Sequence, residues 1–209
     1  MHRYPTARSV PLCLTALRAA LGPVVVALAL WYPSRVVFAV CLVAAFLSDV
    51  FDGIVARRLG VATPNLRRLD SIADSLFYLC AAFAIWHLYP NALLDRIVPL
   101  CMLGGLEATR YAFDLARFGR EASYHMWSSK LWGIALFAGC YSLLALGSDG
   151  AAVSAAVWLG IVADLEGLAI STVLRRWETD VPTLYHALCR RRAAPQPDLP
   201  QNADKCAPS

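Results

Sequence analysis

The sequence is poor in charged residues and rich in apolar ones. Only 16% of its 209 residues are Asp, Glu, Lys or Arg, whereas 58% are hydrophobic, and the mean hydropathy is +0.52. A typical soluble domain of this size carries more charge and less apolar surface. The composition therefore excludes a typical soluble domain and indicates an integral membrane protein.

Clustered cysteine and histidine ligands are also lacking. The seven cysteines, at positions 13, 41, 80, 101, 140, 189 and 206, form no Cys-x-x-Cys pair and have no histidine at ligand spacing. This pattern indicates neither a disulfide framework nor a zinc site. Most of the cysteines lie within apolar runs, where we expect small packing residues.

Six apolar runs are long enough to span a membrane, at about 12–31, 36–55, 69–88, 97–113, 131–146 and 151–174. We predict an all-α integral membrane protein with six transmembrane helices in one domain, 1–192. A short amphipathic segment, 1–10, would precede them, an interfacial helix would cover 177–192, and 193–209 would be a disordered, Pro-rich tail. The first run contains Arg18 and is too long for a cleavable signal peptide.

The basic residues predict the orientation of these helices. Of the 19 Lys and Arg residues, 17 lie at the N-terminus, the second and fourth connections, the C-terminus or the adjoining helix ends. Only Arg35 and Arg96 lie in the odd-numbered connections. By the positive-inside rule both termini are cytoplasmic. We expect a multi-pass protein of a bacterial inner membrane whose aspartate-bearing helix ends face the cytoplasm.

Four aspartates stand at the ends of the second and third apolar runs: Asp49, Asp52, Asp70 and Asp74. Their spacings, three and four residues, place each pair on one face of its own helix. A lone aspartate at a membrane helix centre costs roughly 2.5 to 3.5 kcal/mol, so four together require compensation. Oxygen ligands without cysteine or histidine favour Mg²⁺ or Mn²⁺. Two such ions shared by four carboxylates suit displacement at phosphorus.

The same residues resemble a family signature. The pattern Asp49-x-x-Asp52-Gly53-x-x-Ala56-Arg57, followed by Asp70 and Asp74, resembles that of CDP-alcohol phosphotransferases, membrane enzymes that make phospholipid head groups. The segment Leu14-Thr15-Ala16-Leu17-Arg18 resembles the LTxxR opening common in that family. One position departs from the pattern, because Leu66 stands where the family usually has glycine.

The resemblance implies a role for each matching residue. Asp49 and Asp70 would each bind both metal ions, and Asp52 would complete one metal site. Asp74 would complete the other and act as the catalytic base on the acceptor hydroxyl. The CDP-linked donor would be bound by Thr15, Gly53, Ala56, Arg57 and Thr63.

Structural alternatives stay open for the donor-binding residues. The Thr15 hydroxyl could bond to its own helix backbone, and Gly53 with Ala56 could form a helix-packing face. Arg57 could bind the donor's pyrophosphate through its bidentate fork, or could be a positive-inside anchor.

Further ionisable residues occur later in the chain. Arg110 and Lys130 would bind an acceptor phosphate, although a basic patch at the lipid surface explains them equally. Glu107 could neutralise Arg110 as an i,i+3 pair. Asp164 and Glu166 point about 200° apart on a helix, so they cannot both face one site. His125 has no visible partner and is interpreted as structural.

The implied reaction transfers a phosphatidyl group from a CDP-linked donor to an alcohol and releases CMP. The LTxxR opening favours CDP-diacylglycerol as donor and a small polar acceptor such as glycerol 3-phosphate. The stretch around Lys130, SSKLWG, keeps only the lysine of a GKxKT pattern found in many phosphatidylglycerophosphate synthases, so inositol phosphate or another polyol stays open. Two other classes also stay open: an ion transporter or channel, and a catalytically silent scaffold. We expect a homodimer in contact with membrane lipids and no nucleic-acid partner.

Overall fold

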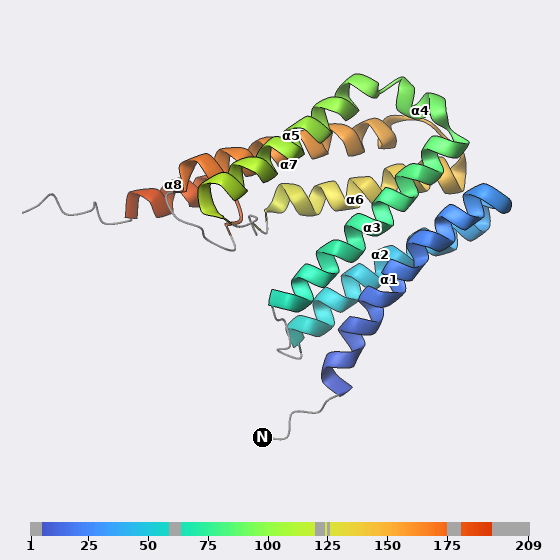
Figure 1. Cartoon of the computed structure of the whole chain (residues 1–209), viewed down its shortest axis with the longest axis horizontal. Helices are drawn as coiled ribbons and strands as arrows, with labels where there is room; N and C mark the ends of the chain where they lie inside the picture. The colour runs from blue at the N-terminus through green and yellow to red at the C-terminus, as the bar shows by residue number, and fades with distance from the viewer. Residues whose placement is uncertain (1–5, 59–63, 120–123, 125, 175–180, 194–209) are drawn as a thin grey trace, which may run out of the picture. The chain divides into compact units, whose positions relative to one another are not determined.

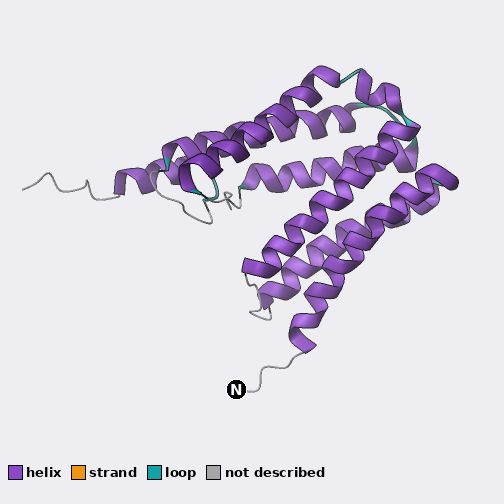
Figure 2. Ribbon diagram, viewed as in Figure 1, coloured by secondary structure: helices purple, strands orange, loops and turns teal. Residues whose placement is uncertain are grey.

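The computed structural model describes residues 6–58, 64–119, 124, 126–174 and 181–193, and within them every regular element is helical (Figures 1 and 2). The helices are α1 (Thr6–Trp31), α2 (Arg35–Arg58), α3 (Pro64–Leu88), α4 (Pro90–Leu94), α5 (Ile97–Phe118), α6 (Trp127–Tyr141), the π-helical turn η1 (Ser142–Leu146), α7 (Ala151–Val173) and α8 (Leu184–Ala193). The predicted all-α class is confirmed.

The chain forms two compact units. Unit 1 comprises residues 1–102 and 132–159, and unit 2 comprises residues 103–131 and 160–209. The prediction of a single domain over 1–192 stays a prediction. The predicted tail lies, except for its first residue, outside the described residues.

Five helices are long and apolar enough to cross a membrane within the described part of the chain. They contain the spans Val10–Trp31, Arg35–Val55, Arg68–Leu88, Trp127–Leu146 and Ala151–Val173. The remaining predicted span, 97–113, is helical but belongs to α5, which carries four charged residues: Glu107, Arg110, Asp114 and Arg117. The prediction of six spans is therefore confirmed for five helices only.

Two predicted boundaries differ from the structure. Helix α1 begins at Thr6, so residues 6–10 of the predicted amphipathic segment continue directly into the first span. The third predicted apolar run starts at residue 69, whereas α3 begins five residues earlier, at Pro64. Proline is well suited to that position because the first helical N–H groups have no intrahelical partner.

The core of unit 1 lies where α1 packs side by side with α2 and α3 (Figure 1). Its largest fully buried apolar side chains are Phe38, Leu42, Leu143 and Leu144. Small residues let the helices approach closely: a Cβ added to Gly22 on α1 would lie 3.2 Å from the Cys80 Sγ on α3. This packing brings the polar residues of three helices to one place.

The first, third and fifth connections meet at one end of unit 1. Arg35 donates a hydrogen bond from Nη1 to the Leu146 carbonyl, 3.2 Å away. Arg96 forms an ion pair with Asp149, with Nη2 and Oδ1 2.7 Å apart. Gly147, at φ +67°, ends the η1 turn in the left-handed conformation that favours glycine. Asp49 lies 14 residues after Arg35 on α2 and so is roughly 20 Å along the helix from this end.

Unit 2 has its own apolar cluster, which contains Met126, Ile170, Leu174 and Val181. Glu166 accepts a hydrogen bond from the Leu184 N–H at 3.3 Å and thereby connects α7 to the start of α8. Part of the predicted interfacial helix, 184–192, is thus helical. Glu166 therefore has a structural contact.

Candidate active site

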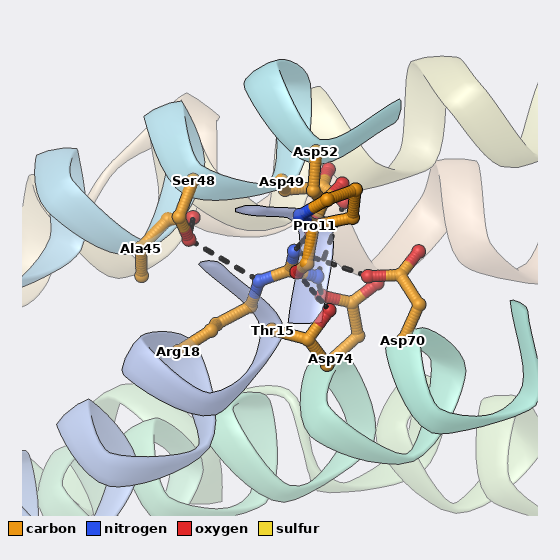
Figure 3. A network of polar contacts seen from close by, with 9 residues as sticks. All are labelled: Pro11, Thr15, Arg18, Ala45, Ser48, Asp49, Asp52, Asp70 and Asp74. Carbon is orange, nitrogen blue, oxygen red and sulfur yellow. Dashed lines mark hydrogen bonds and ion pairs between the residues drawn. The ribbon is translucent and has the colours of Figure 1, made fainter. Parts of the chain in front are cut away.

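The four aspartates project from two facing helices toward one another (Figure 3). Asp49 and Asp52 lie in the last three turns of α2, and Asp70 and Asp74 are the seventh and eleventh residues of α3. Carboxylate oxygens of Asp49, Asp70 and Asp74 all lie within 4.8 Å of one another. The expected convergence of the two helical pairs is therefore observed.

Arg18 of α1 lies between these carboxylates and contacts all four. Its Nη1 is 3.1 Å from Asp49 Oδ1 and also donates to Asp74 Oδ1. Its Nη2 is 3.1 Å from Asp70 Oδ1 and donates to Asp52 Oδ2. Each terminal nitrogen thus joins one aspartate of α2 to one of α3 (Figure 3).

Arg18 is the functional residue that the sequence interpretation did not include among the site residues. It is only 1% exposed, and its Nε lies 3.4 Å from the Ser48 Oγ. Ser48 is itself buried and donates to the Ala45 carbonyl at 2.7 Å. The available signal was an arginine within an apolar span, which demands a carboxylate or carbonyl partner inside the protein.

The carboxylates differ in exposure. The Asp52 side chain is 5% exposed, whereas those of Asp49, Asp70 and Asp74 are 46%, 33% and 35% exposed. Asp52 therefore forms the closed side of the cluster together with Arg18. The other three form an edge that an ion or substrate can reach.

The donor set fits divalent cations that prefer oxygen. Four carboxyl groups surround a single guanidinium, so the cluster has more acidic groups than Arg18 alone can neutralise. Asp70 Oδ1 is buried and, although it lies close to Arg18, makes no hydrogen bond in the described structure. Mg²⁺ places ligand oxygens at about 2.1 Å, so oxygens on opposite sides of the ion are about 4.2 Å apart. Oxygens of Asp49, Asp70 and Asp74, which lie within 4.8 Å of one another, would therefore have to move closer together to share one ion.

The residues predicted to bind the donor fall partly outside the described side chains. Thr15 is buried and its hydroxyl donates to the Pro11 carbonyl at 3.0 Å, which is the backbone bond expected as its structural alternative. Gly53 lies on α2 one position after Asp52 and is partly buried. Ala56 and Arg57 belong to α2, but their side chains lie outside the described part, as does Thr63 entirely. Donor binding by these residues stays a prediction.

In unit 2, Arg110 pairs with Asp164 of α7. The Nη1 to Oδ1 distance is 3.4 Å, and Asp164 is 1% exposed. Gly167 makes room for this arginine, since an added Cβ would lie 3.0 Å from Arg110 Cδ. Within the described residues no ion pair joins Glu107 to Arg110, so the predicted i,i+3 neutralisation is replaced by a contact between two helices.

Asp114 was also missed from the sequence. It is 2% exposed, and its Oδ1 makes no hydrogen bond in the described structure. Its neighbourhood includes Tyr124, whose oxygen accepts a hydrogen bond from the Ser171 hydroxyl at 3.2 Å and whose pKa is raised by burial. Asp114 lies four residues after Arg110 on one face of α5, a spacing that could have indicated it.

Lys130 and His125 complete the predicted residues. The Lys130 ammonium lies 4.6 Å from the centre of the Trp127 ring, a cation–π contact at an exposed position. His125 lies outside the described residues. Phosphate binding by Arg110 and Lys130 stays a prediction.

The fold and the carboxylate cluster together define a helical protein with several candidate membrane spans and a group of aspartates that could hold a metal ion. The family model for CDP-alcohol phosphatidyltransferases matches residues 8–165, and the chain belongs to that family. It is therefore a phosphotransferase, which confirms the predicted enzyme class and argues against the transporter alternative. No curated protein and no solved structure matches the chain.

Proposed function

We propose that the protein transfers the phosphatidyl group of CDP-diacylglycerol to a hydroxyl of a small polar alcohol, with glycerol 3-phosphate as the first candidate, and releases CMP. One observation carries this proposal: oxygens of Asp49, Asp70 and Asp74 lie within 4.8 Å of one another at the accessible edge of the carboxylate cluster. The family match supports transfer from a CDP-linked donor.

Two Mg²⁺ or Mn²⁺ ions are the proposed cofactors. Asp49 and Asp70 come from different helices and would each bind both ions, while Asp52 and Asp74 would complete one site each. When bound, the ions would neutralise the donor's pyrophosphate and the charge that develops on the leaving CMP. The four aspartates would hold the ions in one place because α2 and α3, which carry them, both pack against α1.

Asp74 is the proposed base. The Asp74 side chain is 35% exposed, so a bound hydroxyl can approach this carboxylate and transfer its proton to it. The acceptor oxygen forms a bond to the phosphorus of the phosphatidyl group as the bond from that phosphorus to the CMP oxygen breaks. The hydroxyl proton passes to Asp74, and CMP leaves with the electron pair of the broken bond.

In this proposal, further residues hold the substrates. Thr15, Gly53, Ala56, Arg57 and Thr63 would contact the donor nucleotide. Arg110 and Lys130 would contact the acceptor phosphate. The Arg110 side chain is 26% exposed and pairs with Asp164, so an anionic acceptor must compete with that aspartate for the guanidinium.

The proposed setting is a bacterial inner membrane with both termini cytoplasmic, where nucleotide-activated donors are available. The split of 17 basic residues against two supports this orientation. Arg35 contacts Leu146 and Arg96 contacts Asp149, so the first and third connections lie beside the fifth. These contacts support a chain that crosses the membrane in alternating directions. A homodimer is part of the proposal.

The test is release of radiolabelled CMP from CDP-diacylglycerol by purified protein, with a panel of alcohols that includes glycerol 3-phosphate and inositol phosphate. We expect release that depends on one acceptor and on Mg²⁺ or Mn²⁺. The matched comparison is Asp49→Asn against Asp149→Asn, since Asp149 lies at the far end of unit 1 and pairs with Arg96. No release with any acceptor, from a protein that is folded and metal-bound, would support a catalytically silent scaffold.

A further inference from the structure

The two terminal nitrogens of Arg18 lie between the aspartates of α2 and those of α3. Positive charge is required at these positions to hold the carboxylates of the two helices together. Nη1 contacts Asp49 and Asp74, and Nη2 contacts Asp52 and Asp70, so each nitrogen connects α2 with α3. The contacts to Asp49, Asp70 and Asp74 all use Oδ1. Those three residues are also the group whose oxygens converge closely enough to ligate one ion.

A divalent ion and the guanidinium cannot share these oxygens unchanged. An ion between Asp49 and Asp74 at a ligand distance of about 2.1 Å would lie next to Nη1, which is 3.1 Å from the Asp49 oxygen. Two positive centres so close repel strongly, because the partly buried site screens charge less than water does. The carboxylate lone pairs that point at Nη1 must also turn toward the ion.

Arg18 nevertheless has an anchor that an ion need not disturb. The Asp52 Oδ2 and the Ser48 Oγ lie on the buried side of the cluster, with Asp52 and Ser48 4% and 3% exposed. The other three carboxylates lie on the accessible side. The cluster thus has an inner half suited to holding the arginine and an outer half suited to receiving metal.

We propose that Arg18 is an internal counter-cation that competes with the divalent ions for the carboxylate cluster. As metal binds, the guanidinium gives up Asp49, Asp70 and Asp74 and keeps Asp52 Oδ2 and Ser48, which leaves the other oxygen of Asp52 to complete its metal site. Without metal, the same guanidinium holds the mutually repelling carboxylates of α2 and α3 together. Arg18 is accordingly a positioning residue that sets metal affinity. This inference rests on the metal centre of the proposed function.

Metal affinity tests the competition directly. Mn²⁺ binding would be measured by electron paramagnetic resonance on the full chain in lipid nanodiscs, for the native protein, Arg18→Gln and Arg96→Gln. Arg96 is the matched control because it is also an ion-paired arginine of unit 1, distant from the cluster. We expect Arg18→Gln to bind Mn²⁺ at least tenfold more tightly than the native protein and Arg96→Gln to be unchanged.

The outcomes separate this inference from the proposed function. Equal or weaker Mn²⁺ binding by Arg18→Gln overturns the competition while leaving the metal centre in place. Absence of Mn²⁺ binding by all three proteins overturns the metal centre and the competition together. If Arg96→Gln also bound Mn²⁺ more tightly, the effect would come from the loss of one positive charge anywhere in the protein. That result would overturn the role of Arg18.

A second measurement uses the native protein and does not depend on the folding of Arg18→Gln. The side-chain ¹⁵N resonances of Arg18 and Arg96, assigned through their backbone connectivity, would be followed by NMR during a Mg²⁺ titration. We expect the Arg18 Nη signals to shift as Mg²⁺ binds and those of Arg96 to stay in place. An unshifted Arg18 at Mg²⁺ saturation, with saturation shown by loss of Mn²⁺ binding, overturns the proposal.

Discussion

Arg18 and Asp52, which are 34 positions apart in the chain, form an ion pair on the closed side of the carboxylate cluster. The arginine is 1% exposed and the aspartate 4%. The other ion pairs of Arg18 go to carboxylates that water can reach. Arg18 is thus held by the buried Asp52 on the inner side of the site. On the outer side its guanidinium is shared among three accessible aspartates.

The first prediction concerns stability without metal. In excess chelator, Arg18→Gln should lower the free energy of unfolding by about 3 kcal/mol. This value is at the low end of the usual cost of breaking a buried ion pair, because three of the four carboxylates are in contact with solvent. Thermal unfolding in detergent, with and without Mg²⁺, measures the effect. Mg²⁺ should recover part of the loss in Arg18→Gln, whereas Arg96→Gln should gain no more from Mg²⁺ than the native protein does.

The second prediction concerns the bridging aspartates. Asp49→Asn or Asp70→Asn should abolish CMP release, because an amide lacks the charge that two divalent ions require. Excess EDTA should abolish native activity, and Mg²⁺ or Mn²⁺ should restore it. Asp149→Asn should retain activity. Full turnover by either site variant, or undiminished native turnover in EDTA, would contradict the two-metal site.

The third prediction concerns orientation. Both termini should be cytoplasmic, and Arg35 and Arg96 should face the opposite side of the membrane. Single cysteines from Ser34→Cys and Leu59→Cys, placed in a background without native cysteines, would be labelled with an impermeant thiol reagent in intact cells. Labelling of the first and not the second is expected. Equal labelling from outside would contradict the proposed topology.

The fourth prediction concerns Leu66. This residue lies in the first turn of α3, four positions before Asp70 and eight before Asp74, and so on the same helical face. The aspartates converge with leucine in place, so we expect the native protein to bind CDP-diacylglycerol in Mg²⁺ and Leu66→Gly to change the rate only modestly. Equilibrium binding of the donor to both proteins is the measurement. Absence of donor binding by the native protein, with tight binding by Leu66→Gly, would favour the scaffold alternative.

The fifth prediction concerns unit 2. Arg110→Gln leaves the 1% exposed Asp164 without its ion-pair partner and should lower the free energy of unfolding by about 3 kcal/mol. Adding Asp164→Asn to that variant should recover much of the loss, because the remaining buried group is then neutral. Thermal unfolding of the native protein, both single variants and the double variant forms the required cycle. Additive losses would show that the two residues do not interact.

Much of the local structure follows from the sequence. The apolar runs predicted helices where α1, α2, α3, α5, α6 and α7 are found, because long apolar segments in a membrane must satisfy their backbone within a helix. The aspartate spacings predicted which carboxylates share a helical face. The first turn of α3 was missed because Pro64 favours a turn and a helix start equally.

Contacts between helices were decided only by the tertiary structure. The sequence placed Arg18 in a span and Arg110 beside Glu107, yet Arg18 contacts four aspartates of α2 and α3, and Arg110 contacts Asp164 of α7. Likewise, the sequence spacing of the four aspartates does not indicate that Asp52 is buried whereas the other three are accessible. Helical periodicity specifies the direction of a side chain on its own helix. Which partner that side chain contacts depends on how the helices pack. Small residues such as Gly22 and Gly167 let a second helix or side chain approach closely, and this cannot be seen from one helix alone.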